Sequence, residues 1–414
     1  MLAFKYNVLY SVIGNALFSL GMWLNISVIA KLGSVEAVGD YALANAIISP
    51  LFGLFSLNIR AAVATDVRGQ FEYEAYFATR IVTSIICTVV IIIITFFLER
   101  NYEIWATMIV LTVAKLTESF CDIRSALLLK LNNMKPVAIS LGLRGIGGVL
   151  SLAFGLLVSG SLPVGLACLA TSWIAVYYCY DRQITNTQLG QQQISTEYSS
   201  VKTIIWLCLP LGVLLLINMS INNIPRYFVS SWLDQRALGY FAATTYFIFL
   251  GSIFVNALAL PLHQSFSKCF DNDIQRFKLM LVQGLGVALL LGVCGVLIAI
   301  YCGESILTLA YTKEYAEYSY LLIWTMIASV ALYCSVMMGT AITATRKFKS
   351  QMLANLPIPI ITLLFLLAAH GSFTLVTAAQ AILVAYCTKL VVQTGLIAYL
   401  VLEREKSLSG NLLP

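Results

Sequence analysis

Three polar residues spaced four apart, Asn218, Asn222 and Arg226, interrupt a long apolar stretch of this chain. In an α-helix this spacing places them in one ribbon along one face. The ribbon lies beside Pro225, which has no backbone N–H and should loosen the helix there. An arginine within a bilayer costs about 2.5–3.5 kcal/mol on insertion scales, so it usually faces a polar interior. The ribbon therefore predicts the lining of a hydrated cavity that binds a polar ligand.

Two further apolar segments carry similar stripes. Asn25 shares a face with small and polar residues of the first segment, and Asn45 shares a face with Arg60 in the second. We expect these side chains to line the same cavity, where asparagine hydrogen-bonds a ligand and arginine pairs with its negative charge. Two alternatives stay open. The asparagines can instead hydrogen-bond neighbouring helices, and Arg60 can simply anchor the cytoplasmic end of its helix.

A charged cluster occupies the fourth apolar segment, where Lys115, Glu118 and Asp122 share one helical face and Arg124 points the other way. Such a cluster either neutralises itself or relays protons or ions across the membrane. In the fifth segment Arg144 lies among glycines, which we expect to let another helix pack closely.

Twelve apolar segments must position these residues. The chain has 414 residues, of which 60% are hydrophobic and 11% charged, whereas soluble domains carry roughly 25% charge. A span of the roughly 30 Å hydrocarbon core takes about 20 residues, and lipid leaves only helices or closed barrels as spanning structures. We predict an all-α membrane protein with spans at 6–30, 38–58, 76–98, 104–129, 136–158, 162–180, 204–232, 238–262, 277–301, 320–343, 352–370 and 373–401.

Loop charges predict the orientation, because cytoplasmic loops carry an excess of Lys and Arg. With the N-terminus inside, sixteen loop and tail cations lie on the cytoplasmic side. Four lie outside, namely Lys31, Arg100, Arg236 and Lys313. One missed helix would remove this bias, so it supports twelve spans with both termini in the cytoplasm.

The two halves are related. The segment Ala37–Ala42 that opens the second span is echoed 200 residues later by Ala237–Ala242, which opens the eighth. Six spans per half give a parallel repeat about an axis along the membrane normal. We expect an N-terminal six-helix bundle at 1–180, a cytoplasmic linker at 181–203, a C-terminal bundle at 204–401 and a short cytoplasmic tail at 402–414.

Several classes of protein are disfavoured. No G-x-x-x-x-G-K-[ST] loop is present, and the ten cysteines and two histidines form no metal-binding spacing. We therefore expect no metal, no cofactor, no catalytic residue and no nucleic-acid partner. An integral-membrane glycosyltransferase or polymerase stays open as a rival. It needs catalytic groups on large outer loops, where this chain offers only a few carboxylates such as Glu304, Glu314 and Glu317.

Three stretches resemble a known family. Leu32–Ala44 resembles the LG-x-x-x-(F/Y)-G-x-(Y/F) entry to the second span of polysaccharide flippases, although Asp40 follows Gly39 where the family has an apolar residue. Gly303–Leu307 with Thr312–Ala316 resembles their loop between spans nine and ten, and the basic turn Lys130–Lys135 also fits. The family is the Wzx-type O-antigen or polysaccharide flippases of the multidrug/oligosaccharidyl-lipid/polysaccharide exporter superfamily.

The resemblance implies two six-helix bundles in a V around a central cavity, in a bacterial inner membrane. It implies a non-enzymatic flippase that moves undecaprenyl-diphosphate-linked oligosaccharide from the cytoplasmic to the periplasmic leaflet by alternating access. Arg226 and Arg60 would then pair with the diphosphate. Polysaccharide polymerase and chain-length proteins are the expected partners, and coupling to an ion or proton gradient stays open. The rival within the superfamily is a cation-coupled multidrug antiporter, against which the lack of a carboxylate in the first span counts.

Overall fold

The structure is a computed structural model that describes residues 2–66, 70–98, 102–189, 198–345 and 347–410. In this part of the chain every regular element is helical. Twelve helical segments are long and apolar enough to cross a membrane. The predicted all-α fold with twelve spans is confirmed, and the predicted spans coincide with these helices apart from their ends. Chain contacts divide the protein into two compact units, Met1–Met219 and Ser220–Pro414.

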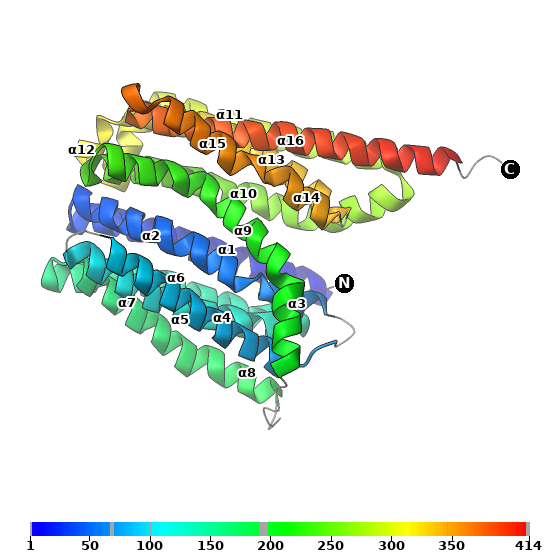
Figure 1. Cartoon of the computed structure of the whole chain (residues 1–414), viewed down its shortest axis with the longest axis horizontal. Coiled ribbons are helices and arrows are strands. Elements are labelled where there is room, and N and C mark those ends of the chain that lie inside the picture. The colour runs from blue at the N-terminus through cyan, green and yellow to red at the C-terminus, as the bar shows by residue number, and fades with distance from the viewer. Residues whose placement is uncertain (1, 67–69, 99–101, 190–197, 346, 411–414) are drawn as a thin grey trace. The chain divides into compact units, whose positions relative to one another are not determined.

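The first unit contains α1 (Leu2–Leu32), α2 (Val35–Ser56), α3 (Ile59–Thr65), α4 (Tyr73–Phe97), α5 (Tyr102–Lys130), α6 (Met134–Ser159), α7 (Leu162–Val176), the π-helical turn η1 (Tyr177–Asp181), α8 (Arg182–Leu189) and the first part of α9 (Tyr198–Trp232) (Figure 1). Helices α7, η1 and α8 follow one another without a break. The residues 181–189 that we expected in a linker are therefore helical, and residues 190–197 lie outside the described residues.

Glycines set the close packing of the first unit. A Cβ atom added to Gly21 on α1 would lie 2.6 Å from the carbonyl oxygen of Gly145 on α6, and one added to Gly155 on α6 would lie 2.7 Å from Cα of Gly165 on α7. No side chain fits at such distances, so α1, α6 and α7 pack backbone against backbone. The expectation that the glycines beside Arg144 admit a neighbouring helix is confirmed.

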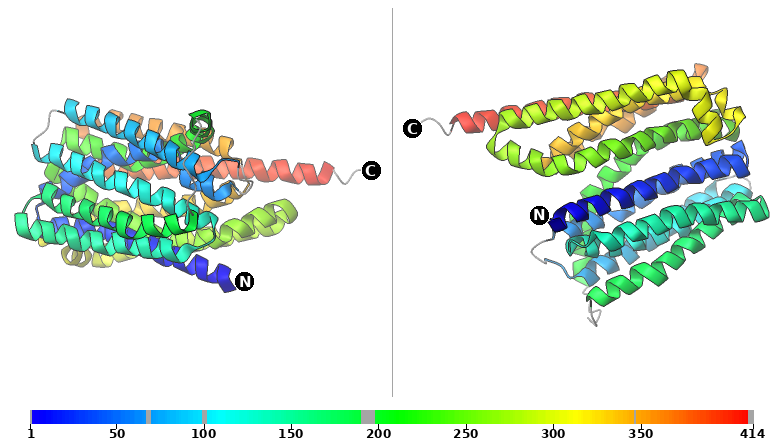
Figure 2. Two further views of the ribbon diagram at one scale, coloured as in Figure 1. Left: turned by 90° about the horizontal axis from the view of Figure 1, so that it is seen from below. Right: turned by 180° about the vertical axis from the view of Figure 1, so that it is seen from behind.

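The second unit contains the end of α9, then α10 (Gln235–Asn272), α11 (Ile274–Ala310), α12 (Lys313–Ala316), α13 (Ser319–Ala344), α14 (Phe348–Asn355), α15 (Pro357–Ala368), the 3₁₀ turn η2 (His370–Ser372) and α16 (Leu375–Gly410). Helix α13 packs against α10, α11 and α16, and it is the most buried span of the chain. Helices α10 and α11 form a hairpin that turns at Asp273 (Figure 2).

The 200-residue repeat is visible in helix capping. Helices α1 and α9 end at Leu32 and Trp232, and α2 and α10 begin three residues later. Ser34 Oγ accepts a hydrogen bond from the Ala37 N–H at 3.1 Å, and Asp234 Oδ1 accepts one from the Ala237 N–H at 2.6 Å. A side chain that bonds the third N–H is what a helix N-terminus needs. The same local chemistry thus starts the second span of each half.

One predicted span is broken. Leu57 and Asn58 adopt left-handed conformations, with φ of 51° and 48°, between α2 and α3. Arg60 therefore does not continue the face of Asn45 as a straight helix would require. That part of the sequence prediction is wrong, because two left-handed residues change the register of the helix after Leu57.

Candidate functional site

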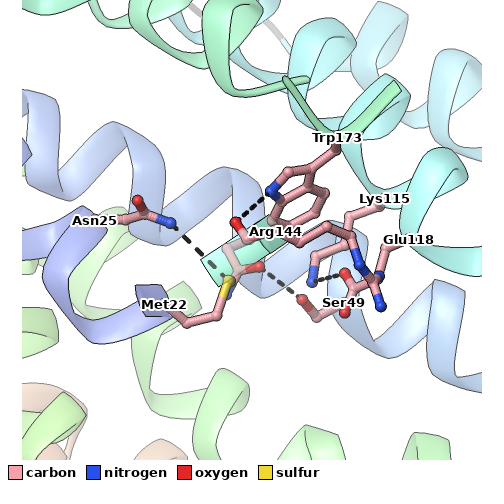
Figure 3. A network of polar contacts seen from close by, with 8 residues as sticks. Met22, Asn25, Ser49, Lys115, Glu118, Arg144 and Trp173 are labelled. Carbon is pink, nitrogen blue, oxygen red and sulfur yellow. Dashed lines mark hydrogen bonds and ion pairs between the residues drawn. The ribbon is translucent and has the colours of Figure 1, made fainter. Parts of the chain in front are cut away.

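A polar cluster lies inside the first unit, which we call the N-terminal polar cluster. It brings together side chains from α1, α2, α5 and α6, namely Asn25, Ser49, Lys115, Glu118 and Arg144 (Figure 3), and Asn45 joins it through its hydrogen bond with Ser49. Lys115 Nζ and Glu118 Oε2 form an ion pair at 2.8 Å, and Ser49 Oγ donates to Asn45 Oδ1 at 2.7 Å. Within the charged face of α5, Lys115 and Glu118 therefore neutralise each other.

Arg144 is the unusual member of this cluster. It is 1% exposed, yet its Nε, Nη1 and Nη2 atoms have no hydrogen-bond partner in the described part of the chain. Its guanidinium lies 5.3 Å from the ring centroid of Phe18, and its backbone carbonyl accepts from Trp173 Nε1 at 2.9 Å. The carboxylates of Glu118, Asp122 and Asp181 act on it electrostatically. Figure 3 shows its side chain extending toward the Lys115–Glu118 pair.

The third residue of the expected relay is held elsewhere. Asp122 Oδ1 pairs with Arg60 Nη1 at 3.5 Å, and both side chains are partly exposed, at 37% and 29%. Arg60 thus has a carboxylate partner from α5 that its own helix did not reveal. Asn25 is 1% exposed, and its Oδ1 atom is buried without a hydrogen-bond partner among the described residues.

A second polar cluster lies in the second unit, which we call the Arg226 cluster. It consists of Asn222, Asn223, Arg226, Thr245, Tyr246 and Tyr386. Arg226 is 2% exposed and donates to Asn223 Oδ1 at 3.4 Å and to Thr245 Oγ1 at 3.3 Å. Its guanidinium lies 5.0 Å from the ring centroid of Tyr246, and its Nε has no hydrogen-bond partner in the described residues.

Asn222 lies one helical turn before Arg226 on α9, as the ribbon predicted. Its Oδ1 accepts a hydrogen bond from Tyr386 of α16 at 2.8 Å. Asn218 precedes Asn222 by one turn but belongs to the first unit, because the division between the units falls within α9 after Met219. The structure thus groups Asn222 with Arg226, and groups Asn25 and Asn45 with the charged residues of α5 and α6.

The donor set of the Arg226 cluster suits an anionic or hydroxyl-rich ligand. An arginine offers five N–H donors in a rigid fork and an asparagine offers two more. Among the described residues no group of three or more His, Cys, Asp or Glu could hold a metal ion. The chemistry that these side chains offer is therefore hydrogen bonding and charge pairing.

Comparisons with known proteins place the fold. Over 93% of its length the chain is 24% identical to the capsular polysaccharide biosynthesis protein CapF of Staphylococcus aureus, of which it covers 97%. It is similar to an inward-facing structure of a multidrug resistance MATE family transporter of the MOP superfamily, with a TM-score of 0.76 and 12% identity, over 94% of this chain and 96% of that one. The chain therefore has the fold of this MOP superfamily transporter.

A third comparison brings in a flippase. The lipid II flippase MurJ, in an inward closed conformation, matches with a TM-score of 0.73 and 13% identity, over 96% of this chain and 90% of that one. No protein-family model matches the chain. The resemblance to polysaccharide flippases of the MOP superfamily, seen first in three short stretches, is confirmed over nearly the whole chain. The protein is a multi-pass membrane protein, and it shares its fold with transporters whose halves follow a 6+6 arrangement.

Sequence reasoning did not assign a binding role to several residues of these clusters, among them Asn223 and the four residues that follow. Arg144 was visible as a cation in an apolar run, but its glycine neighbours suggested packing only. Thr245, Tyr246 and Tyr386 gave no signal, because tyrosine and threonine are ordinary in membrane helices. Tyr386 is 164 residues from Asn222 in the chain, and only the fold brings the two together.

Proposed function

We propose that this protein is a flippase for lipid-linked saccharide units of a bacterial surface polysaccharide. The observation that carries the proposal is the end-to-end relationship to a capsular polysaccharide biosynthesis protein, together with the fold shared with a lipid II flippase. The proposed cargo is an undecaprenyl-diphosphate-linked oligosaccharide, moved from the cytoplasmic to the periplasmic leaflet of the inner membrane.

The Arg226 cluster is the proposed headgroup site. A diphosphate carries several anionic oxygens, and a guanidinium binds such oxygens bidentately where a lysine acts as a point charge. Asn222 beside Arg226 supplies neutral donors for phosphate or sugar oxygens. No step in this scheme makes or breaks a covalent bond, so the protein acts as a transporter and not as an enzyme.

Alternating access is the proposed mechanism, in which the polyprenyl chain stays in lipid while the headgroup crosses. The N-terminal polar cluster is the proposed coupling element, because Lys115 and Glu118 form a mostly buried ion pair. A proton or cation that displaces one member of this pair would change the charge inside the first unit. Surface-polysaccharide polymerase and chain-length proteins remain the proposed partners.

A strain without the gene tests the proposal. We expect lipid-linked oligosaccharide to accumulate on the cytoplasmic leaflet and surface polysaccharide to disappear, with both restored by the wild-type gene. At matched expression Arg226→Ala should fail to restore them, and Arg226→Lys should restore them in part, since it keeps the charge and loses the fork. Normal surface polysaccharide in the deletion strain would refute the proposed function.

A cation-coupled drug antiporter is the second candidate, because the solved structure described above with a TM-score of 0.76 is a multidrug resistance transporter. It predicts that the deletion strain becomes sensitive to cationic drugs while its surface polysaccharide is unchanged. The same strain therefore separates the two functions.

A further inference from the structure

A buried tyrosine fixes the orientation of the Asn222 side chain. Tyr386 lies on α16, is 3% exposed and donates its hydroxyl proton to Asn222 Oδ1 at 2.8 Å. Arg226 acts on the same hydroxyl electrostatically. The bond joins α16 to the one turn of α9 that carries both Asn222 and Arg226.

This bond decides which end of the Asn222 amide remains available. An asparagine side chain has one acceptor oxygen and one NH₂ group with two donors, and rotation by half a turn exchanges them. Tyr386 occupies the oxygen, and Nδ2 has no partner among the described residues while Asn222 is half-buried. The amide therefore presents donors next to a guanidinium whose Nε is also without a hydrogen-bond partner in the described chain.

We propose that Tyr386 is a positioning residue for cargo binding, one that holds Asn222 with its NH₂ group as a donor to an anionic phosphate oxygen. The proposal rests on the proposed function, since it names how the headgroup site chooses its ligand. An asparagine without this hydrogen bond would be free to rotate and present its oxygen instead. That oxygen would repel a phosphate oxygen, so Tyr386 lowers the cost of ordering the site before the ligand arrives.

A binding experiment on the purified full-length protein in detergent tests this role. The probe is a polyprenyl diphosphate titrated by calorimetry, with the uncharged polyprenol of the same length as the second ligand. Tyr386→Phe should weaken diphosphate binding about ten-fold, the size expected for one lost orienting hydrogen bond. It should leave polyprenol binding unchanged, because the lipid chain makes no use of Asn222.

Asn222→Asp is the complementary variant. Its carboxylate keeps the volume of the side chain and still accepts from Tyr386, but it replaces the donors by a negative charge. We expect diphosphate binding to fall about a hundred-fold, further than in Tyr386→Phe, since a charge of the wrong sign faces the phosphate.

The chain offers a matched control in Tyr333 on α13. This tyrosine is also 3% exposed and donates to a backbone carbonyl, that of Ile248, at 3.2 Å. Tyr333→Phe removes a buried hydroxyl from the same unit without touching Asn222, so it should leave diphosphate affinity unchanged. Tyr386→Phe should also have no further effect in the Asn222→Ala background, where there is no amide to orient.

The outcomes of these experiments distinguish a failure of the proposed Tyr386 role from a failure of the proposed flippase function. Wild-type protein that binds the diphosphate no better than the polyprenol would overturn the proposed function and the inference together. Wild-type protein that prefers the diphosphate, with Tyr386→Phe unchanged or matched by Tyr333→Phe, would overturn the inference alone. A second ten-fold loss in the Asn222→Ala background would show that the Tyr386 hydroxyl acts on something other than Asn222.

Discussion

Replacing Arg144 by methionine should stabilise the first unit. Its side chain is 1% exposed and none of its guanidinium nitrogens has a hydrogen-bond partner in the described residues. A buried cation without hydrogen-bond partners keeps its desolvation cost, and two of the three carboxylates that attract it, Glu118 and Asp122, already pair with Lys115 and Arg60. Replacing a complete buried ion pair or triad by apolar side chains of similar volume is often neutral or stabilising by about 1–4 kcal/mol. Arg144 can be replaced alone because its guanidinium has no hydrogen-bond partner in the described residues that would be left behind. We expect Arg144→Met to leave the free energy of unfolding unchanged or to raise it by an amount within that range.

Arg124 is the matched control for this substitution. It is 8% exposed and also lies against aromatic rings, 5.3 Å from Phe77 and 5.4 Å from Tyr177. Unlike Arg144 it donates hydrogen bonds to Tyr177, Thr185 and Asn186. A hydrogen bond to a charged group contributes about 1.5–3 kcal/mol, so Arg124→Met should destabilise the unit by about 3 kcal/mol or more.

Thermal unfolding of the purified protein in detergent measures both effects. Four native cysteines are buried, Cys87, Cys121, Cys208 and Cys334, so a thiol-reactive dye reports their exposure on unfolding. The expected order of midpoints is Arg144→Met above wild type and Arg124→Met below it. If both variants lose the same stability, the guanidinium of Arg144 has partners in the membrane and the reasoning from its unbonded nitrogens is refuted. A more stable Arg144→Met that no longer restores surface polysaccharide would assign the arginine to transport.

Three further predictions test other features. Gly21→Leu should destabilise the first unit by about 3 kcal/mol or prevent its assembly, because α6 leaves no room for a side chain. Gly286→Ala is the control and should be tolerated, because no atom lies within 4 Å of the added Cβ. Protein yield and the unfolding midpoint check both variants. Arg60→Gln and Asp122→Asn should each change the free energy of unfolding by less than about 1 kcal/mol, since the ion pair is long and partly exposed. A double-mutant cycle on the same midpoints measures the coupling energy of the pair. A coupling energy several times larger than about 1 kcal/mol would contradict the prediction. The pKa of Asp66 lies below its usual 3.8, because hydrogen bonds from backbone N–H groups and a tyrosine outweigh burial, which acts in the opposite direction. The contribution of Asp66 to stability is therefore present above pH ~4 and lost as the pH falls through the lowered pKa. Asp66→Asn should flatten that part of the pH–stability curve.

The sequence was sufficient for the features that depend on local physics. Apolar length predicted twelve helices because lipid leaves the backbone no other solution, and the 200-residue echo predicted the repeat because Ser34 and Asp234 cap equivalent helices. The broken second span was missed for an equally physical reason. Leu57 and Asn58 are not glycines, so nothing in their types announces left-handed backbone, and the face assigned to Arg60 was wrong as a result.

Spacing along one helix does not predict which residues pair with side chains from other helices. The ribbon on α9 identified Asn222 and Arg226, but their partners come from α10 and α16, far along the chain. Spacing did place Lys115 and Glu118 on one face of a helix, where residues three apart are neighbours and these two form an ion pair. It could not predict that Asp122 would pair with Arg60 instead of joining them.

Unbonded guanidinium groups now provide a criterion that the sequence lacked. Arg80, Arg144 and Arg226 are each at most 3% exposed, and each has at least one buried nitrogen without a hydrogen-bond partner in the described residues. Leucine or methionine would fill the same volumes without this cost, so packing alone does not explain arginine at three such positions. Buried ionisable residues in membrane helices usually mark a substrate or ion pathway. On that basis Arg144 and Arg80 join Arg226 as the cations whose replacement should affect transport more than folding, in contrast to Arg124, whose hydrogen bonds already account for its presence.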